Sequence, residues 1–316
     1  MSRAGSTSAV HDRTTLGIAL ILGSVLMMSF ADALVKLVSA DITIWQLFAV
    51  RSIVAVPLLL GITRIKRESL RLHAVGWSCV RSGLLVLTWL AFYASLPVLT
   101  LSVAAVAVYT NPIITALLSA QVLGERVTRR QWVGVLLGFA GVVVILQPGS
   151  DAFSWYTLLP LLAAVCYALA MVLTRSKCQI EAPLALGLNL QVGFLLTGLV
   201  GLTIGACLDL DATTAAKMPF LLGDWSPLDA DALGLLVGLG VMSAVYFVGV
   251  ARAYQIAPPS VIATFDYAYL VWAALWGFLL FAEIPGPATV AGMALITSAG
   301  LLVAVRPPSA RRESTG

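Results

Sequence analysis

The stretch Val98–Leu123 reads VLTLSVAAVAVYTNPIITALLSAQVL and contains no charged residue. A run of this length suffices for a helix that crosses the hydrocarbon core of a bilayer, which takes about 20 residues. Because backbone polar groups within lipid must be satisfied inside the segment itself, such a run is expected to be helical. The stretch therefore predicts a membrane-spanning helix.

Comparable apolar runs continue in both directions along the chain. Together with the first they give ten predicted spans: Leu16–Leu37, Ile44–Ile62, Ala74–Leu96, Val98–Leu123, Gln131–Gln147, Phe153–Thr174, Pro183–Cys207, Ala232–Ala251, Ala257–Phe281 and Pro287–Val305. Of the 316 residues, 60% are hydrophobic and 11% are charged, whereas an ordinary soluble domain has about 25% charged residues. The sequence therefore predicts an all-α, polytopic membrane protein of ten transmembrane helices.

Basic residues fall mainly in alternate connections between these spans. If the N-terminal tail lies in the cytoplasm, most of the 19 Lys and Arg residues are cytoplasmic, while only Lys36 and Lys217 lie in outer connections. By the positive-inside rule both termini are then cytoplasmic, which requires an even number of spans. We expect a multi-pass protein of the cell inner (plasma) membrane, with residues 1–15 and 307–316 as cytoplasmic tails.

The chain also repeats itself weakly at an offset of 158 residues. The offset aligns Ser102 with Ser260, Val103 with Val261, Tyr109 with Tyr267, Glu125 with Glu283 and Gly134 with Gly292. We therefore expect two related five-helix halves, residues 16–150 and 151–306, which insert with opposite orientation because five is odd. Inverted repeats are common in secondary transporters, which hold their substrate near the midplane between the halves. A chance match between apolar helical sequences is the alternative.

Two motifs accompany the fourth and fifth spans. Tyr109-Thr-Asn-Pro112 lies inside the fourth span, Leu123-Gly-Glu-Arg126 ends it, and Gly134 and Gly141 follow in the fifth. On these residues the sequence resembles the EamA-type branch of the drug/metabolite transporter superfamily, over nearly the whole chain. Arg51 resembles an arginine that is common in the second span of that family. The resemblance implies ten helices in two inverted halves and movement of a solute by alternating access.

The second half departs from this motif pattern. Leu270 stands where the first half has Pro112, and Ala282 and Ile284 flank the second glutamate. The phrase Ser29-Phe-Ala-Asp-Ala-Leu-Val-Lys36 is similar to the start of members that carry S-adenosylmethionine or riboflavin. Amino-acid and drug exporters share the same scaffold, so riboflavin-like, S-adenosylmethionine-like and amino-acid-like substrates all stay open.

Four ionisable residues lie inside predicted spans, where a charge costs roughly 3 kcal/mol or more on insertion scales. They are Asp32, Arg51, Arg81 and Asp266. Asp32 is a candidate site for a substrate cation or a proton. Alternatively, Asp32 forms a local ion pair with Lys36, which lies one turn further along the same helix face.

Arg51 and Arg81 are candidates for binding an anionic group of the solute, or for neutralising one of the two aspartates. On the third span, Arg81 shares a helix face with Thr88 and Phe92, and Trp89 lies beside them. Such a face suits a planar solute with a polar edge, although aromatic residues in membrane helices more often serve packing or the interfacial belt.

Asp266 lies in the middle of the ninth span, within Thr264-Phe-Asp-Tyr-Ala-Tyr269. A buried carboxylate can exchange a proton near neutral pH, so Asp266 is a candidate for coupling solute movement to protons. The alternative is a static partner for one of the two arginines. Further candidates for the wall of the site are Trp89, Tyr93, Asn111 and Tyr267.

Other residues are expected to shape and pack the helices. Proline removes a backbone donor and frees a carbonyl, so Asn111-Pro112 predicts either a plain kink or a hinge beside the site. Glu125 and Glu283 lie at span ends, where capping or pairing with a loop base such as Arg129 or Arg130 is expected. GxxxG pairs favour close packing of helices, within the chain or in a homodimer; they are Gly134/Gly138, Gly201/Gly205 and Gly234/Gly238.

The chain holds no motif for cofactor or metal chemistry. Its four cysteines fit neither a zinc site nor a CxxC pair, and no Ser-His-Asp, HExxH, P-loop or GxGxxG pattern is present. We therefore expect no cofactor, no metal and, in the absence of a nucleic-acid motif, no nucleic-acid partner. The expected partners are the lipid bilayer and a small-molecule solute.

These observations favour a secondary active transporter, not an enzyme, that moves a small organic metabolite by alternating access, with or without proton coupling. A membrane-embedded enzyme acting on lipid-linked substrates and a non-transporting membrane interaction protein are the two alternatives. The enzyme would need clustered catalytic groups at an interface. The interaction protein would not need charges at mid-depth in several spans.

Overall fold

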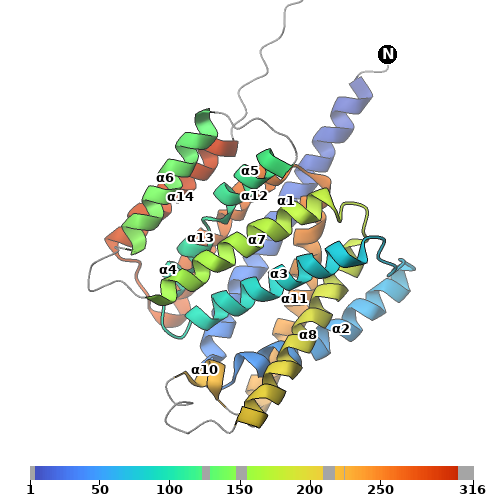
Figure 1. Ribbon diagram of the computed structural model, residues 1–316, viewed down its shortest axis with the longest axis vertical. Coiled ribbons are helices and arrows are strands. Elements are labelled where there is room, and N and C mark those ends of the chain that lie inside the picture. Colours follow the sequence, from blue (N-terminus) through green and yellow to red (C-terminus); the bar gives the residue numbers. More distant parts are fainter. Residues whose placement is uncertain (1–3, 123–128, 147–154, 209–217, 224, 305–316) are drawn as a thin grey trace, which may run out of the picture.

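The computed structural model describes residues 4–122, 129–146, 155–208, 218–223 and 225–304 (Figure 1). Within these ranges every regular element is a helix. In chain order the elements are α1 (Ala4–Val38), α2 (Ile44–Lys66), α3 (Val75–Ser95), α4 (Leu101–Val108), α5 (Asn111–Val122), α6 (Arg129–Leu146), the 3-10 helix η1 (Trp155–Thr157), α7 (Leu158–Ser176), α8 (Pro183–Leu208), α10 (Pro219–Leu222), α11 (Ala230–Ile256), α12 (Pro259–Asp266), α13 (Ala268–Phe281) and α14 (Pro287–Ala304). The expected all-α class is confirmed.

Eight segments of the described chain are long and apolar enough to cross a membrane. Two further helices, α6 and α14, contribute shorter apolar stretches, Trp132–Gly141 and Pro287–Ala299. These segments correspond in order to the ten predicted spans, so the chain is a polytopic membrane protein. One boundary differs from the expectation, because α1 begins at Ala4 and part of the predicted polar tail is helical.

The fourth span is broken into α4 and α5, between Val108 and Asn111. Pro112 causes the break, because it has no backbone N–H and its ring would clash with the carbonyl four residues earlier. That carbonyl belongs to Val108, and Asn111 Nδ2 donates to it over 3.1 Å. The ninth span is broken into α12 and α13 at Tyr267, the residue that aligns with Tyr109 in the repeat. The kink predicted in the fourth span is thus a break, and the ninth span has an equivalent break that the sequence did not predict.

The main contacts between the two halves are symmetric: where a first-half helix packs against a second-half helix, the equivalent helices of the opposite halves pack against each other. α3 packs against α7 as α11 packs against α1, and α4 packs against α13 as α12 packs against α5. The pairs α2 with α8 and α6 with α14 each join equivalent helices, and they form opposite flanks of the bundle (Figure 1). The space between the halves therefore lies among α1, α3, α7, α11 and the two broken spans.

Two of the GxxxG pairs contribute to helix packing through one glycine each. A side chain at Gly138 on α6 would collide with Ile113 on α5. A side chain at Gly201 on α8 would collide with the indole of Trp45 on α2. Both glycines of the third pair, on α11, face space that is empty of described residues. A homodimer contact stays a prediction.

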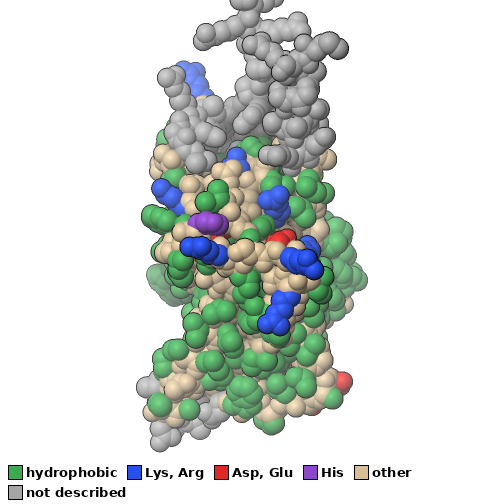
Figure 2. All heavy atoms as spheres, turned by 90° about the vertical axis from the view of Figure 1, so that its right-hand side faces the viewer, with side chains coloured by type: hydrophobic (Ala, Val, Ile, Leu, Met, Phe, Trp, Pro, Cys, Tyr) green, Lys and Arg blue, Asp and Glu red, His purple; other side chains and the backbone are tan. Residues whose placement is uncertain are grey.

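The connections gather at two ends of the bundle. At the end where α1 begins, Glu181 of the α7–α8 connection accepts hydrogen bonds from the backbone N–H groups of His73 and Ala74. At the other end, Trp45 Nε1 donates to Leu221 O of α10 over 2.8 Å. We call the first the basic end, because it carries Arg64, Lys66, Arg67, Arg71, Arg175 and Lys177, and the second the far end. Figure 2 shows Lys and Arg in a band above an apolar lower half.

Candidate functional site

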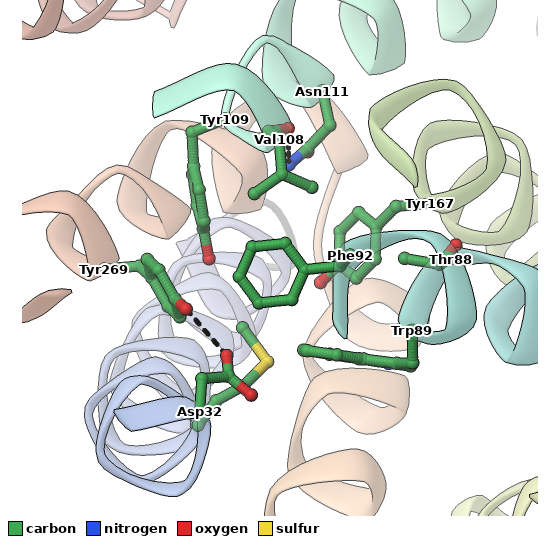
Figure 3. A pocket seen from close by; sticks show the side chains of 10 residues that line it. Asp32, Thr88, Trp89, Phe92, Val108, Tyr109, Asn111, Tyr167 and Tyr269 are labelled. Atoms are coloured by element: carbon green, nitrogen blue, oxygen red, sulfur yellow. Dashed lines mark hydrogen bonds between the residues drawn. The ribbon is translucent and has the colours of Figure 1, made fainter. Parts of the chain in front are cut away.

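A pocket with about 310 Å³ of empty space lies between the two halves, beside the break of the fourth span (Figure 3). Its lining residues are Met28, Asp32, Thr88, Trp89, Phe92, Val108, Tyr109, Asn111, Tyr167 and Tyr269. They come from α1, α3, α4, α5, α7 and α13 and from the residue between α4 and α5. Only about 20 Å³ of this space is open to a water-sized molecule, far less than the roughly 300–1,000 Å³ of ligand pockets, so the pocket is closed in this structure.

Asp32 is fully buried at one side of this pocket. Its Oδ1 accepts a hydrogen bond from the Tyr93 hydroxyl over 2.9 Å, and its Oδ2 accepts one from the Tyr269 hydroxyl over 2.6 Å. Arg51 Nη1 in turn donates to the Tyr93 oxygen over 3.4 Å. The two tyrosines thus use both carboxylate oxygens, and Tyr93 links the carboxylate to the guanidinium.

The predicted pairing of Asp32 with Lys36 is wrong. Lys36 Nζ lies 2.6 Å from Glu283 Oε1 and also donates to Leu99 O over 2.9 Å. The other oxygen of Glu283 accepts from the backbone N–H of Leu101, at the start of α4, over 3.0 Å. Glu283 therefore caps a helix, as expected, but its basic partner is Lys36 and not a loop base such as Arg129 or Arg130. Glu125 lies outside the described residues.

Arg51 is buried in a cage of aromatic rings. Its guanidinium carbon lies 4.6 Å from the ring centre of Phe194, 5.4 Å from that of Phe48 and 5.9 Å from that of Tyr93. Such cation–π contacts stabilise a cation that has lost its water. We call a buried polar atom unpartnered when it makes no hydrogen bond within the described part of the chain. Arg51 Nε and Nη2 are both unpartnered in this sense.

Aromatic side chains make up half of the residues that line the pocket. The rings of Tyr109 and Tyr269 are stacked, with centroids 4.5 Å apart and planes 20° apart. Trp89 and Phe92 meet edge to face at 5.8 Å. Figure 3 shows the Phe92 ring between the Tyr109–Tyr269 pair and Trp89, and the Tyr167 hydroxyl pointing inward. The unpartnered atoms of this wall are Trp89 Nε1, Asn111 Oδ1 and the Tyr167 hydroxyl.

A second polar group lies outside the pocket lining. Asp266 Oδ2 accepts from the Tyr254 hydroxyl over 2.6 Å, while its Oδ1 is unpartnered. Arg81 Nε donates to Thr174 Oγ1 over 2.6 Å, while its Nη1 is unpartnered. Tyr167 interacts electrostatically with both Asp266 and Arg81. Neither arginine makes a salt bridge with an aspartate among the described residues.

The structure brings together most of the predicted site residues. Asp32, Trp89 and Asn111 line the pocket, and Tyr93 and Arg51 lie directly behind Asp32. The other three predicted residues, Arg81, Asp266 and Tyr267, neither line the pocket nor hydrogen-bond to Asp32. The expected face of the third span is only partly correct, because Thr88, Trp89 and Phe92 line the pocket without Arg81.

Sequence reasoning left three tyrosines of the pocket out of the predicted site, although Tyr269 could be expected either to hydrogen-bond the solute or to pack. Tyr109 belongs to the aligned Tyr109–Tyr267 pair, and Tyr269 lies three residues from Asp266, so the repeat and the motif both pointed near them. Tyr167 has no such signal. It reaches the pocket only because α7 packs against α3 and α5, which is tertiary information.

Outside the spans, Glu181 has the clearest electrostatic role. Its side chain is 2% exposed, and its oxygens accept from the N–H of Ala74 over 2.6 Å and of His73 over 2.9 Å. Burial alone would raise the pKa of this carboxyl, but the hydrogen bonds from Ala74 and His73 outweigh burial and lower its pKa. The charged form of Glu181 therefore stabilises the basic end.

Comparisons with known proteins agree with this architecture. The profile of the EamA-like transporter family matches residues 15–147. A riboflavin transporter of Rhizobium johnstonii is 33% identical over 71% of this chain and 67% of its own length. A riboflavin transporter of Vibrio cholerae is 29% identical over 79% and 77%, and the pseudopaline exporter CntI of Pseudomonas aeruginosa is 27% identical over 92% and 96%.

A solved crystal structure superposes with a TM-score of 0.64 at 18% identity, and covers 92% of this chain and 97% of its own. At that identity the likeness shows the fold alone. The relatives, by contrast, match in sequence over most of their length, and they are named as transporters. The chain is therefore a member of the EamA-like transporter family, in the drug/metabolite transporter superfamily.

Proposed function

We propose that this transporter moves a planar, largely uncharged aromatic metabolite, of the flavin type, across the inner membrane by alternating access. The observation that carries the proposal is the central pocket between the two halves, which combines aromatic walls with a few unpartnered polar atoms. Relatives named as riboflavin transporters support the same class of solute.

The pocket suits such a solute in two ways. A heterocycle that stacks on an aromatic side chain gains about 1–3 kcal/mol, as judged from bases on protein rings. An unpartnered buried polar atom costs about 1–3 kcal/mol, and the polar edge of the ring can supply the missing hydrogen bonds to Trp89 Nε1 and Asn111 Oδ1. At Asp32 a cationic group would share the carboxylate with Tyr93 and Tyr269, which already donate one hydrogen bond to each oxygen.

A zwitterionic, amino-acid-like solute is the second candidate. The unpartnered Arg51 and Arg81 nitrogens and the unpartnered oxygen of Asp266 favour it, and the pseudopaline exporter is similar over nearly the whole chain. These charged groups lie behind or outside the pocket lining, whereas half of the lining residues are aromatic. The flavin-type solute is therefore our first choice.

We further propose that the basic end faces the cytoplasm and that Asp266 carries a coupling proton. The collection of Lys and Arg at one end supports this orientation under the positive-inside rule. The single hydrogen bond of Asp266 leaves one oxygen available for a proton. The named relatives are transporters, which favours transport over the membrane-enzyme and interaction-protein alternatives.

Binding and uptake of riboflavin by the purified protein in liposomes test the proposal. Stacking on Trp89 should quench flavin fluorescence, and Trp89→Ala should weaken binding by roughly tenfold or more. The matched control is Trp132→Ala, because Trp132 is an exposed residue on α6, away from the pocket. Transport of zwitterionic solutes without any flavin binding would contradict the flavin-type solute and support the amino-acid-like one.

A further inference from the structure

Three polar side chains lie one turn apart on α5. Asn111, Thr115 and Ser119 follow each other at intervals of four residues, so they share one face of the helix. They are 2%, 0% and 1% exposed. In each of them an oxygen is unpartnered: Asn111 Oδ1, Thr115 Oγ1 and Ser119 Oγ make no hydrogen bond within the described ranges.

The two hydroxyls are unusual for this protein. In other membrane helices the threonine hydroxyl donates to the carbonyl four residues earlier, which is the normal local solution. Examples are Thr174 to Ala170 O over 2.8 Å and Thr197 to Gly193 O over 2.8 Å. Thr115 and Ser119 lack even this bond in the described structure. Ser102 Oγ and Ser176 Oγ are also unpartnered, but among the described residues only this face of α5 has three such side chains at successive four-residue intervals.

The face leads from the pocket to the basic end. Asn111 lines the pocket, and Ser119 lies eight residues further along α5, about 12 Å at the normal helical rise. α5 packs against α7 and α12, on the side of the molecule where α1 begins (Figure 1). On those neighbours the Tyr167 hydroxyl and Asp266 Oδ1 are also unpartnered. α5 and the two helices packed against it thus carry a group of buried polar atoms without hydrogen-bond partners in the described part of the chain.

A buried polar atom without a hydrogen-bond partner destabilises the conformation that buries it. A second conformation in which water reaches the atom does not carry this penalty. Alternating access requires such a conformation. We propose that the Asn111–Thr115–Ser119 face of α5 is the wall of the translocation path between the pocket and the basic end. It is closed in this structure, where α5 packs against α7 and α12, and it takes up water when α5 separates from them. The inference rests on alternating access in the proposed function and is independent of the flavin-type solute.

Cysteine accessibility tests this path. In a background without Cys79, Cys166, Cys178 and Cys207, single Thr115→Cys and Ser119→Cys variants are exposed to a membrane-impermeant thiol reagent during transport. We expect modification only from the side of the basic end. The control is Ser243→Cys, because Ser243 is equally buried but its hydroxyl bonds to Gly240 O. Transport that continues while Thr115→Cys and Ser119→Cys are as unreactive as the control overturns the proposal.

A second pair of variants covers the case in which the cysteine variants fail to fold. Thr115→Val keeps the shape of the side chain and removes the hydroxyl, so it should favour the closed state and slow turnover by about tenfold, with solute affinity unchanged. Thr115→Ser keeps the hydroxyl and should keep turnover. Equal turnover in both variants contradicts a hydrated wall. Failure of the flavin-type proposal appears separately, as absence of riboflavin binding with the labelling pattern intact.

Discussion

Asp32 and Asp266 are both fully buried aspartates, yet their hydrogen bonds give them different chemistry. Tyr93 and Tyr269 hold both oxygens of Asp32, and Arg51 lies behind Tyr93. Asp32 is therefore suited to fix the geometry of the pocket. Asp266 has one tyrosine partner and one unpartnered oxygen, so a proton can be added there without breaking an existing bond.

Asp266→Asn separates coupling from folding. The amide oxygen can still accept from Tyr254, but the side chain no longer takes up or releases a proton. We expect the variant to keep its thermal stability and solute affinity and to lose the acceleration of transport by a pH gradient. Uptake into liposomes with and without an imposed gradient measures this. A wild-type response to the gradient in Asp266→Asn would rule out the coupling role.

The comparison variant is Asp32→Asn. Its amide group would turn an N–H donor toward the hydroxyl of Tyr93 or Tyr269, which now donates to a carboxylate. We expect lower thermal stability, by roughly 1–3 kcal/mol in unfolding free energy for a lost bond to a charged group. The two substitutions thus predict different outcomes in thermal unfolding: Asp32→Asn loses stability, and Asp266→Asn keeps it.

At the scale of elements, the sequence predicted the spans and the irregularity of the fourth span correctly. Apolar run length predicted the spans, and Asn111-Pro112 predicted that the fourth would deviate, because proline acts locally. The choice of partner could not be predicted. Lys36 lies one turn from Asp32 but binds Glu283, 247 residues away in the chain, because Tyr93 and Tyr269 already hold Asp32. Only tertiary packing brings those tyrosines together.

The loops of the basic end give a prediction for stability against pH. Glu181 joins the α2–α3 and α7–α8 connections, and its lowered pKa means that the folded state favours its charge. A carboxyl group whose pKa is lowered in the folded state stabilises the fold fully at pH values above its pKa in the unfolded chain, about 4.3. This stabilisation is lost as the pH falls through the pKa of the folded state. Glu181→Gln should therefore destabilise by about 1.5–3 kcal/mol near pH 7 and by progressively less below pH 4.

Thermal unfolding of the purified protein across this pH range measures the effect. The control is Glu68→Gln, because Glu68 is an exposed carboxyl in the same α2–α3 connection. We expect Glu68→Gln to follow the wild type at every pH. A constant difference between Glu181→Gln and the wild type from pH 7 down to pH 3 would mean that the loop contact does not depend on the charge of Glu181.

At the scale of the whole molecule, both ends of the pocket are closed by contacts between the two halves. Toward the basic end α5 is packed against α7 and α12. Toward the far end Glu283, after α13, holds Lys36 of α1 and the first N–H of α4. A transporter that alternates must open one closure at a time. The contact of Glu283 with Lys36 and Leu101 closes the far end as the packing of α5 closes the basic end. It should therefore set how often the pocket opens toward the far end.

Glu283→Gln tests that counterpart. The amide loses the ion pair with Lys36 and weakens the cap on Leu101 N–H, so the far end should open more often. The reporter is Ser95→Cys in the cysteine-free background, because Ser95 is fully buried at the far end of α3. Its modification from the far-end side should accelerate by roughly tenfold. Asp231→Asn, at an exposed acid of the same end, should leave the rate unchanged.

Charge reversal distinguishes this closure from a simple ion pair. In Lys36→Glu combined with Glu283→Lys the attraction between the two side chains is restored, but their backbone partners are not exchanged. Leu99 O, which now accepts from Lys36, would face a carboxylate, and Leu101 N–H, which now donates to Glu283, would face an ammonium group. The double variant should therefore stay as open as Glu283→Gln. Full rescue of the slow Ser95→Cys modification would show that the side-chain pair alone closes the far end and that the start of α4 takes no part.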